Sequence, residues 1–186
     1  LMDLFLSLLA LILLSPFLII ISILVLFSGP GGIIYKQVRV GKDEKHFKLW
    51  KFRSMIPNAD KKGQLTVGGR DPRITRIGYF LRKYKLDELP QLVNILQGDM
   101  SIIGPRPEVP KYVAMYSTDQ KRVLSVRPGL SDYASLEYIN ENEVLEKYDD
   151  PEKGYIEEEM RKKLELNLRY IADQSVRTDM LHMWRT

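Results

Sequence analysis

Cysteine is absent from this sequence of 186 residues, and only two histidines and two tryptophans occur. Without cysteine, these residues form no disulfide, no thiolate metal site and no cysteine nucleophile. The two histidines, His46 and His182, lie far apart in the sequence. Any catalysis is therefore expected to rest mainly on carboxylates, hydroxyl groups or a bound metal ion.

An excess of charge of one sign is also missing, because 28 Lys and Arg residues face 24 Asp and Glu residues, a net charge of +4. The basic residues are nevertheless concentrated: residues 36–53 hold seven Lys or Arg and two acidic residues. Such a segment suits anionic lipid headgroups, phosphates or nucleic acid, so charge alone does not choose among them. The length suits one domain of ordinary size with a short N-terminal appendage.

Polar residues are rare in the segment 4–27, which is apolar apart from Ser7, Ser15, Pro16 and Ser22. A helix over this segment would reach about 36 Å, enough to span a bilayer core of roughly 30 Å. A secretory signal peptide fits less well, because the apolar run is long and no small-residue cleavage site follows it. Since Leu1 is not an initiator methionine, the natural N-terminus is expected upstream.

The pair Ser15-Pro16 lies near the middle of the apolar run. Proline removes a backbone donor and clashes with the carbonyl four residues earlier, so a bend is expected there. The freed carbonyl needs another partner, and the neighbouring serine hydroxyl can supply it. Two topologies remain open on spacing alone: a kinked helix that crosses the membrane, and a re-entrant hairpin whose ends leave by the same face.

The segment Ser28-Gly29-Pro30-Gly31-Gly32 is dense in turn formers and divides a membrane helix at residues 1–28 from a domain at residues 29–186. In that domain the pattern predicts strands over 33–40, 46–52, 99–104 and 133–139, and helices over 74–84, 90–97 and 151–171. The fold class is therefore α+β, with a compact domain of amphipathic helices and a small sheet or hairpin after the N-terminal helix.

Asp87 and Glu88 directly precede the predicted helix over 90–97. Adjacent acids at a helix start have a simple structural explanation, because they complement the helix dipole and cap free amides. Here, however, a basic helix precedes them, and two proline turns that carry Arg106 and Arg127 follow. This setting suggests that anionic groups meet a pair of acids, which ordinarily needs a divalent cation and arginines to offset like charge.

Six runs, in order, resemble the motifs of the bacterial sugar transferase family, the small monotopic phosphoglycosyl transferases. They are YKQVRVG at 35–41, KFRSM at 51–55, DPRITRIG at 71–78, LDELPQ at 86–91, GDMSIIGPRPE at 98–108 and RPGL at 127–130. The resemblance covers nearly the whole chain. After the last run many relatives have Thr-Gly-Trp-like residues where this chain has Ser131-Asp132-Tyr133, so its sugar or nucleotide preference is expected to differ.

The resemblance implies transfer of a sugar 1-phosphate from a UDP-sugar to undecaprenyl phosphate, with release of UMP, as the first membrane step of glycoconjugate assembly. Asp87 would be the catalytic nucleophile that forms a covalent phosphosugar. Glu88 would share the catalytic work and bind Mg²⁺ together with Asp87. The expected phosphate contacts are Arg82, Arg106, Arg127 and Arg53. A UDP-activated N-acetylated hexosamine, or its deoxy derivative, is the first expectation for the sugar, and a hexose is the second.

The resemblance also favours the re-entrant topology, because a Ser-Pro pair breaks the N-terminal helix of the family. The active site would then lie on the cytoplasmic face of the bacterial inner membrane. The expected partners are the UDP-sugar, undecaprenyl phosphate and membrane lipids, and not nucleic acid, while the oligomeric state is not indicated. The alternative is a non-enzymatic, membrane-anchored basic domain that binds anionic lipid or polymer; it explains the charge but not the order of the motifs.

Overall fold

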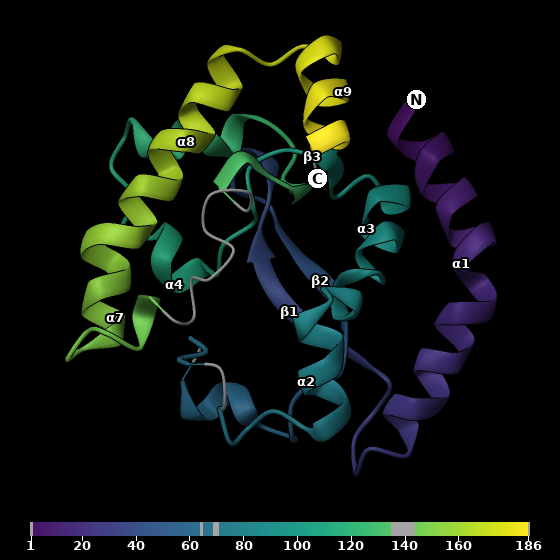
Figure 1. Cartoon of the computed structure of the whole chain (residues 1–186). Helices are drawn as coiled ribbons and strands as arrows, with labels where there is room; N and C mark the ends of the chain where they lie inside the picture. The colour runs from purple at the N-terminus through teal and green to yellow at the C-terminus, as the bar shows by residue number, and fades with distance from the viewer. Residues whose placement is uncertain (1, 64, 69–70, 135–143, 186) are drawn as a thin grey trace.

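A computed structural model of the chain describes residues 2–63, 65–68, 71–134 and 144–185. Helix α1 (Met2–Leu26) comes first and runs in a curve along one side of the rest of the molecule (Figure 1). The other elements, in chain order, are β1 (Ile34–Val40), β2 (His46–Phe52), α2 (Arg76–Lys83), α3 (Gln91–Gln97), β3 (Ser101–Ile103), α4 (Pro110–Val113), β4 (Gly129–Ser131), α7 (Pro151–Gly154), α8 (Met160–Ala172) and α9 (Val176–Arg185). This mixture of helices with two small two-stranded sheets in the described residues confirms the predicted α+β class.

Helix α1 continues through Pro16, where the sequence predicts a bend. Proline cannot donate to the carbonyl of Ile12, but the hydroxyl of Ser15 donates to that carbonyl at 2.8 Å. The serine therefore replaces the missing backbone bond, and Figure 1 shows one curved helix rather than two separate ones. The predicted role of the Ser15 hydroxyl is thereby confirmed, whereas the re-entrant topology and the Ser-Pro break that the family resemblance implies stay predictions.

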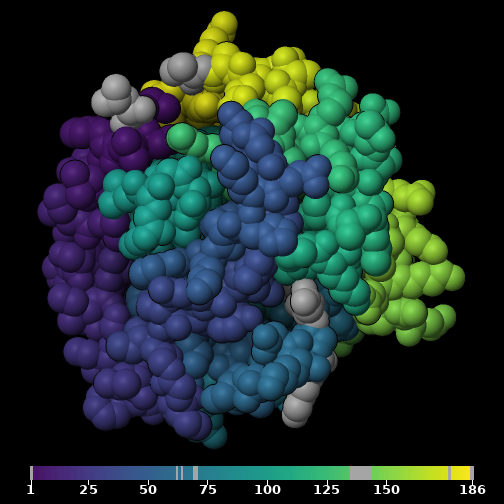
Figure 2. All heavy atoms as spheres, turned by 180° about the vertical axis from the view of Figure 1, so that it is seen from behind, coloured from purple at the N-terminus to yellow at the C-terminus, as the bar shows by residue number. Residues whose placement is uncertain are grey.

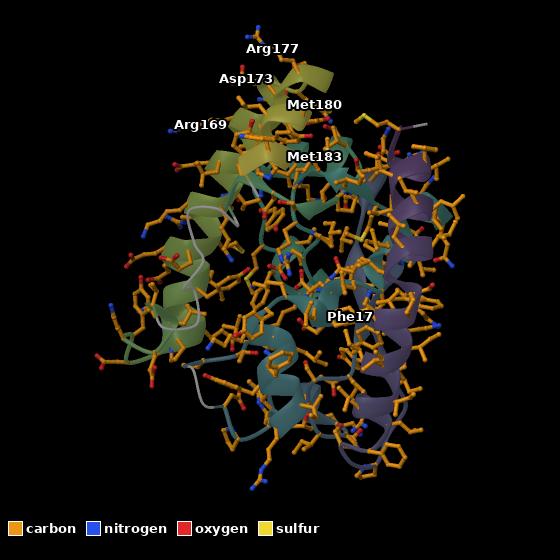
Figure 3. All side chains as sticks on the ribbon, turned by 45° about the vertical axis from the view of Figure 1, so that its right-hand side comes forward. Phe17, Arg169, Asp173, Arg177, Met180 and Met183 are labelled. Atoms are coloured by element: carbon orange, nitrogen blue, oxygen red, sulfur yellow. The ribbon has the colours of Figure 1, made fainter. Side chains whose placement is uncertain are left out.

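One face of α1 packs on the domain and the other is exposed. The packed face contributes Ile21 and Val25, both buried, to an apolar cluster with Phe52 of β2 and Leu81 of α2. Exposed apolar side chains on α1 include Leu4, Phe5, Leu8, Leu9, Ile12, Leu13, Phe17, Ile19, Ile20, Ile23 and Leu24. Figures 2 and 3 show the helix at one edge of the molecule, with side chains directed outward. By length and composition α1 can cross a membrane, and a bilayer would cover this apolar face.

The predicted hairpin is confirmed by the antiparallel pair β1–β2, in which Ile34 lies opposite Phe52 and Val40 opposite His46. In Figure 1 the hairpin lies in the middle of the molecule, between α3 and α1 on one side and α4 and α8 on the other. Leu49 and Phe52 are buried, and Phe47 is partly buried. The hairpin thus forms the central support of the domain.

The two predicted helices on either side of the acidic pair are confirmed as α2 and α3. Thr75 begins α2, because its hydroxyl accepts from the backbone N–H of Gly78 at 2.9 Å. Gly98, with φ at +83°, ends α3. A Cβ atom on Gly78 would lie 1.8 Å from the carbonyl oxygen of Ser54. Only glycine therefore allows α2 to approach so closely to the segment that follows β2.

A second, smaller sheet joins the two arginine-bearing proline turns. Strands β3 and β4 are parallel, with Ser101 opposite Gly129 and Ile103 opposite Ser131. The predicted strand over 99–104 is confirmed as β3. The predicted strand over 133–139 lies largely outside the described residues, and Tyr133 and Ala134, which are described, are helical.

The predicted helix over 151–171 is confirmed, although it has a π-helical stretch, Tyr155–Glu159, between α7 and α8. Helix α9 then packs back on the domain through His182, which is 2% exposed. The His182 ring stacks on Tyr133, and its Nε2 lies 2.9 Å from the hydroxyl oxygen of Ser131. Figure 3 shows Arg169 and Arg177 of α8 and α9 pointing away from the body of the molecule.

Candidate active site

The acidic pair lies in a short 3₁₀ turn, Leu86–Glu88, between α2 and α3. Lys85 precedes it with φ at +56°, a left-handed conformation that is unusual for a residue other than glycine. This conformation turns the chain sharply, and Leu86 and Leu89 then pack in the apolar cluster that contains the end of α1. The packing of these two leucines fixes the turn on the domain, and Asp87 and Glu88 are only 4% and 8% exposed.

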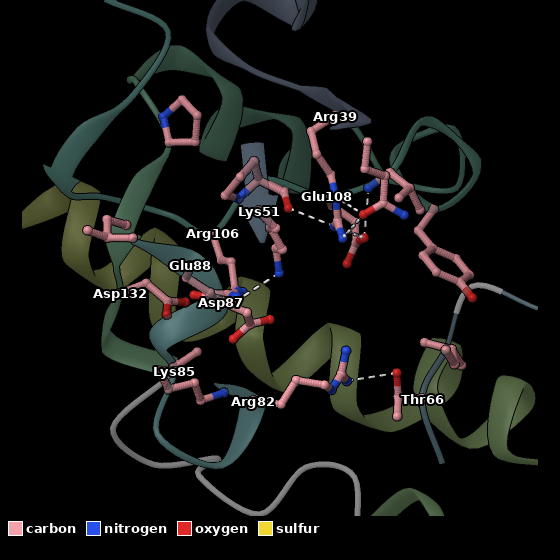
Figure 4. Close-up of a pocket in the computed structure, with 18 of the residues that line it drawn as sticks. Arg39, Lys51, Thr66, Arg82, Lys85, Asp87, Glu88, Arg106, Glu108 and Asp132 are labelled. Atoms are coloured by element: carbon pink, nitrogen blue, oxygen red, sulfur yellow. Dashed lines mark hydrogen bonds and ion pairs between the residues drawn. The ribbon is translucent and has the colours of Figure 1, made fainter. Parts of the chain in front are cut away.

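Glu88 is paired with two cations from different elements. Lys51 of β2 places its Nζ 2.9 Å from Oε1 of Glu88, and Arg106, from the turn after β3, donates to the same oxygen. Figure 4 shows the three side chains meeting beside Asp87. Burial raises the pKa of Glu88, but Arg106 and Lys51 outweigh burial and hold that pKa well below its ordinary range. Glu88 is therefore ionised, with its charge compensated.

Asp87 has the opposite shift. Burial raises the pKa of Asp87, the charge of Lys51 lowers it, and the charge of Glu88 raises it again, with a net rise. Among the residues that the structure describes, none donates a hydrogen bond to the Asp87 carboxylate. Two neighbouring carboxylates with opposite pKa shifts in a cavity are a recognised sign of a functional site. The carboxylate oxygens of Asp87 are thus available to a metal ion or a substrate.

The acidic pair opens on a cavity of about 970 Å³. Lys51, Arg82 and Arg106 also line this cavity. The guanidinium of Arg82 donates to the hydroxyl of Thr66 at 2.9 Å, and Figure 4 shows Arg82 directed toward Thr66. Five of the predicted site residues therefore line one cavity: Asp87, Glu88, Arg82, Arg106 and Arg53.

Arg53 and Arg127 are placed differently. Arg127 is exposed and is not among the residues that line the cavity. Arg53 lines the cavity, but all three of its side-chain nitrogens donate to the segment that ends α1. Its Nη2 donates to the carbonyl of Val25 at 2.7 Å, and its Nη1 and Nε donate to the carbonyls of Pro30 and Gly32, each at 2.8 Å. Phosphate binding by these two arginines stays a prediction, and the contacts of Arg53 give it a structural role.

The sequence assigned no role in the site to Lys51 or Glu108, and it indicated Asp132 only as part of the run that differs from many relatives. Lys51 has a usable signal, because it lies two residues after Leu49 in a strand and so shares its inward face. Glu108 accepts from Arg39 Nη1 at 3.0 Å and from the Tyr155 hydroxyl, a set of partners that no local pattern indicates. Asp132 is 3% exposed and lines the cavity. Its position depends on the pairing of β3 with β4.

The carboxylates of Asp87 and Glu88 can supply only part of the ligands of the expected Mg²⁺. In the described ranges no group of three or more His, Asp or Glu residues could hold a metal by itself. Mg²⁺, however, commonly binds to one or two carboxylates together with substrate phosphates. Asp87 suits this role, because burial opposes its negative charge and its oxygens accept no hydrogen bond from a described residue. Asp87 and Glu88 could thus hold the ion jointly with a phosphate-bearing ligand.

Comparison with known proteins gives a family match and curated relatives. The family described as bacterial sugar transferase matches residues 1–186. The chain is 38% identical to the UDP-glucose:undecaprenyl-phosphate glucose-1-phosphate transferase of Escherichia coli over 187 residues. The aligned region covers 96% of this chain and 37% of that protein. It is 34% identical to the UDP-N-acetylgalactosamine-undecaprenyl-phosphate N-acetylgalactosaminephosphotransferase of Aeromonas hydrophila over 190 residues. That aligned region covers 100% of this chain and 41% of that protein.

A shorter relative is more similar. The putative undecaprenyl-phosphate N-acetylgalactosaminyl 1-phosphate transferase of Bacillus subtilis is 48% identical over 118 residues, which cover 63% of this chain and 66% of that protein. The chain thus spans about two fifths of the length of the two longer relatives and about two thirds of the shorter one.

Proposed function

Because the chain belongs to the bacterial sugar transferase family, we propose that it transfers a sugar 1-phosphate from a UDP-sugar to undecaprenyl phosphate and releases UMP. The names of the relatives support the reaction class, since each describes transfer of a sugar phosphate with undecaprenyl phosphate as the lipid. The observation that carries the proposal is the unequal acidic pair. Glu88 is bound by two cations, while Asp87 beside it faces the cavity with its oxygens uncommitted.

Asp87 is the proposed nucleophile. A carboxylate oxygen of Asp87 attacks the β-phosphorus of the UDP-sugar, a new P–O bond forms, and the bond from that phosphorus to the bridging oxygen breaks. UMP leaves with the electron pair of the broken bond, and the sugar phosphate stays on Asp87. A phosphate oxygen of the lipid then attacks the same phosphorus, and the carboxylate of Asp87 is released.

Cationic side chains around the pair favour this sequence. Arg106 and Lys51 compensate Glu88, so that only one carboxylate in the turn repels an incoming phosphate. Arg82 lines the cavity and donates a hydrogen bond to the Thr66 hydroxyl, and a phosphate oxygen can replace that hydroxyl in a charge-assisted bond. When bound, Mg²⁺ would neutralise phosphate charge and so let an anionic nucleophile approach.

The exposed apolar face of α1 supports a membrane location, which a lipid substrate also requires. In this proposal both ends of α1 and the cavity face the cytoplasm, at the inner membrane, where UDP-sugars are made. The relatives differ in the sugar that their names give, glucose or N-acetylgalactosamine. An N-acetylated hexosamine remains the first expectation for this chain, and a hexose the second.

The test uses the full chain in lipid nanodiscs with Mg²⁺ and a panel of UDP-sugars, without lipid acceptor. We expect one of them to release UMP and to add the mass of one phosphosugar to a peptide that contains Asp87. Asp87→Asn should form no adduct and no lipid product, whereas Glu88→Gln should form the adduct slowly. An adduct on another residue, or transfer to lipid by Asp87→Asn, would contradict the covalent route. Failure of every UDP-sugar to release UMP with or without acceptor would contradict the transferase.

A further inference from the structure

One face of helix α8 forms part of the cavity wall. Met160, Lys163, Leu164 and Asn167 all line the cavity, and their spacing of three and four residues places them on the same side of the helix. Two of these side chains are apolar and one is a cation, so Asn167 is the neutral polar group of this face. The helix is long enough to hold it in a fixed position on the wall.

Asn167 is 5% exposed, and its Oδ1 accepts no hydrogen bond from any residue in the described part of the chain. A buried acceptor without a partner is unfavourable, and buried polar groups in proteins nearly always have one. Two other described residues, Gln91 and Glu159, also have a buried side-chain atom without a partner, but neither lines the cavity. Of these three residues, Asn167 is therefore the one that borders the space where a ligand would bind.

We propose that Oδ1 of Asn167 accepts a hydrogen bond from an O–H or N–H group of the nucleotide sugar, and this inference rests on the proposed function. An amide oxygen repels a phosphate oxygen, so its partner must be a neutral donor. A UDP-sugar has such donors in two parts: the hydroxyls or acetamido group of the sugar, and the ribose and uracil of the nucleotide. Lys51, Arg82 and Arg106 suit the diphosphate between those parts, because cations bind its oxygens.

The test measures binding to the full chain in nanodiscs by titration calorimetry, with Asp87→Asn as the background so that no covalent step follows. Asn167→Leu, of similar volume, should weaken binding of a UDP-sugar about threefold to tenfold, as expected for one lost hydrogen bond between neutral groups. Titrations with UMP and UDP locate the donor. A loss seen only with UDP-sugars places it on the sugar, and a loss seen also with UMP places it on the nucleoside.

Stability separates ligand recognition from a packing role. Asn167→Leu removes an unpaired polar atom from the interior, so the melting temperature without ligand should stay unchanged or rise. Equal affinity of the background protein and Asn167→Leu for every ligand would overturn the inference, and so would a lower melting temperature without any loss of affinity. If the background protein bound none of the UDP-sugars, the proposed function would fail as well.

Discussion

The ammonium nitrogen of Lys51 lies 2.9 Å from Oε1 of Glu88 and so joins the central hairpin to the turn that bears the acidic pair. Arg106 donates to the same oxygen from the turn after β3. This arrangement fixes the chemical difference between the two acids. Glu88 serves as the point where three segments meet, and Asp87, one residue earlier, keeps its oxygens available for a substrate.

Removal of the Lys51 charge should therefore impair both the site and the fold. Truncating one partner of a buried ion pair costs about 3–5 kcal/mol when the other charge is left alone. Because Arg106 still pairs with Glu88, we expect Lys51→Met to lower the free energy of unfolding by the low end of that range. UMP release should fall strongly, because the charge of Lys51 also lowers the pKa of Asp87. Denaturant titration and a UMP assay measure the two effects.

Lys48 provides the matched control for that prediction. It lies on the same strand but is exposed, and it forms no ion pair with a described residue. Lys48→Met should leave stability and UMP release close to those of the parent protein. Equal effects of the two substitutions would mean that the general basicity of β2, and not the Lys51–Glu88 pair, matters.

The opposite pKa shifts of the two acids predict a specific dependence on pH. Asp87 must be ionised to attack, so adduct formation should fall on acidification with an apparent pKa above the ordinary aspartate value of 3.8. The folded state holds the Asp87 proton more tightly than the unfolded state does, so ionised Asp87 destabilises the fold at neutral pH. Asp87→Asn should therefore raise the free energy of unfolding at pH 7, and the gain should vanish at low pH.

For Glu88 the effect of ionisation on the stability of the fold has the opposite sign. Its pKa is lowered in the folded state, so its contribution to stability is present above the ordinary value of 4.5 and is lost as the pH falls below that value. Glu88→Gln should accordingly destabilise the protein at pH 7, and the difference from the parent protein should shrink on acidification. Urea titrations of both variants between pH 7 and pH 3 test these signs, and a destabilised Asp87→Asn variant at pH 7 would contradict the assignment.

Local signals explain what the sequence predicted well. The hairpin, α2 and α3 follow from alternation, from the cap at Thr75 and from Gly98, all of which act within a few residues. The hydrogen bond of the Ser15 hydroxyl beside Pro16 is also a local effect, because the hydroxyl replaces the backbone donor that proline lacks. The strand pattern places Lys51 on the inward face, but it does not indicate its partner Glu88, which lies 37 residues away in sequence. Asn167 could not be assigned a role, because most of the cavity that it lines is formed by segments distant in sequence.

Gly78 should be intolerant of substitution. A Cβ atom there would lie 1.8 Å from the carbonyl oxygen of Ser54, which also accepts from the N–H of Thr75 at 3.0 Å. Gly78→Ala would push α2 away from the hairpin, at a cost of about 1–3 kcal/mol as in other overpacked sites. Because α2 carries Arg82 and leads to Asp87, UMP release should fall as well. Thermal unfolding and the UMP assay measure this.

Gly32 is the control for Gly78, since an added Cβ would meet nothing nearer than 3.8 Å and its φ is not positive. Gly32→Ala should be close to neutral in both assays. A stable and active Gly78→Ala variant would show that α2 can move without consequence for the acidic pair, contrary to the packing described above.

Arg53 allows a decision between a structural and a substrate-binding role. Its guanidinium donates to the carbonyls of Val25, Pro30 and Gly32 and so ties the end of α1 to the end of β2. Hydrogen bonds to a charged group contribute about 1.5–3 kcal/mol each, so Arg53→Met should cost about 3 kcal/mol or more. We expect faster hydrogen exchange in residues 25–32 and a lower melting temperature, both without ligand present. Arg53→Lys, which can keep only part of these bonds, should have a melting temperature between those of the parent protein and Arg53→Met.

A phosphate contact of Arg53 would instead leave the ligand-free melting temperature unchanged and weaken binding of UDP, because only the complex would lose an interaction. Arg127→Met is the matched control, since Arg127 is exposed and lies off the cavity, and it should change neither exchange nor stability.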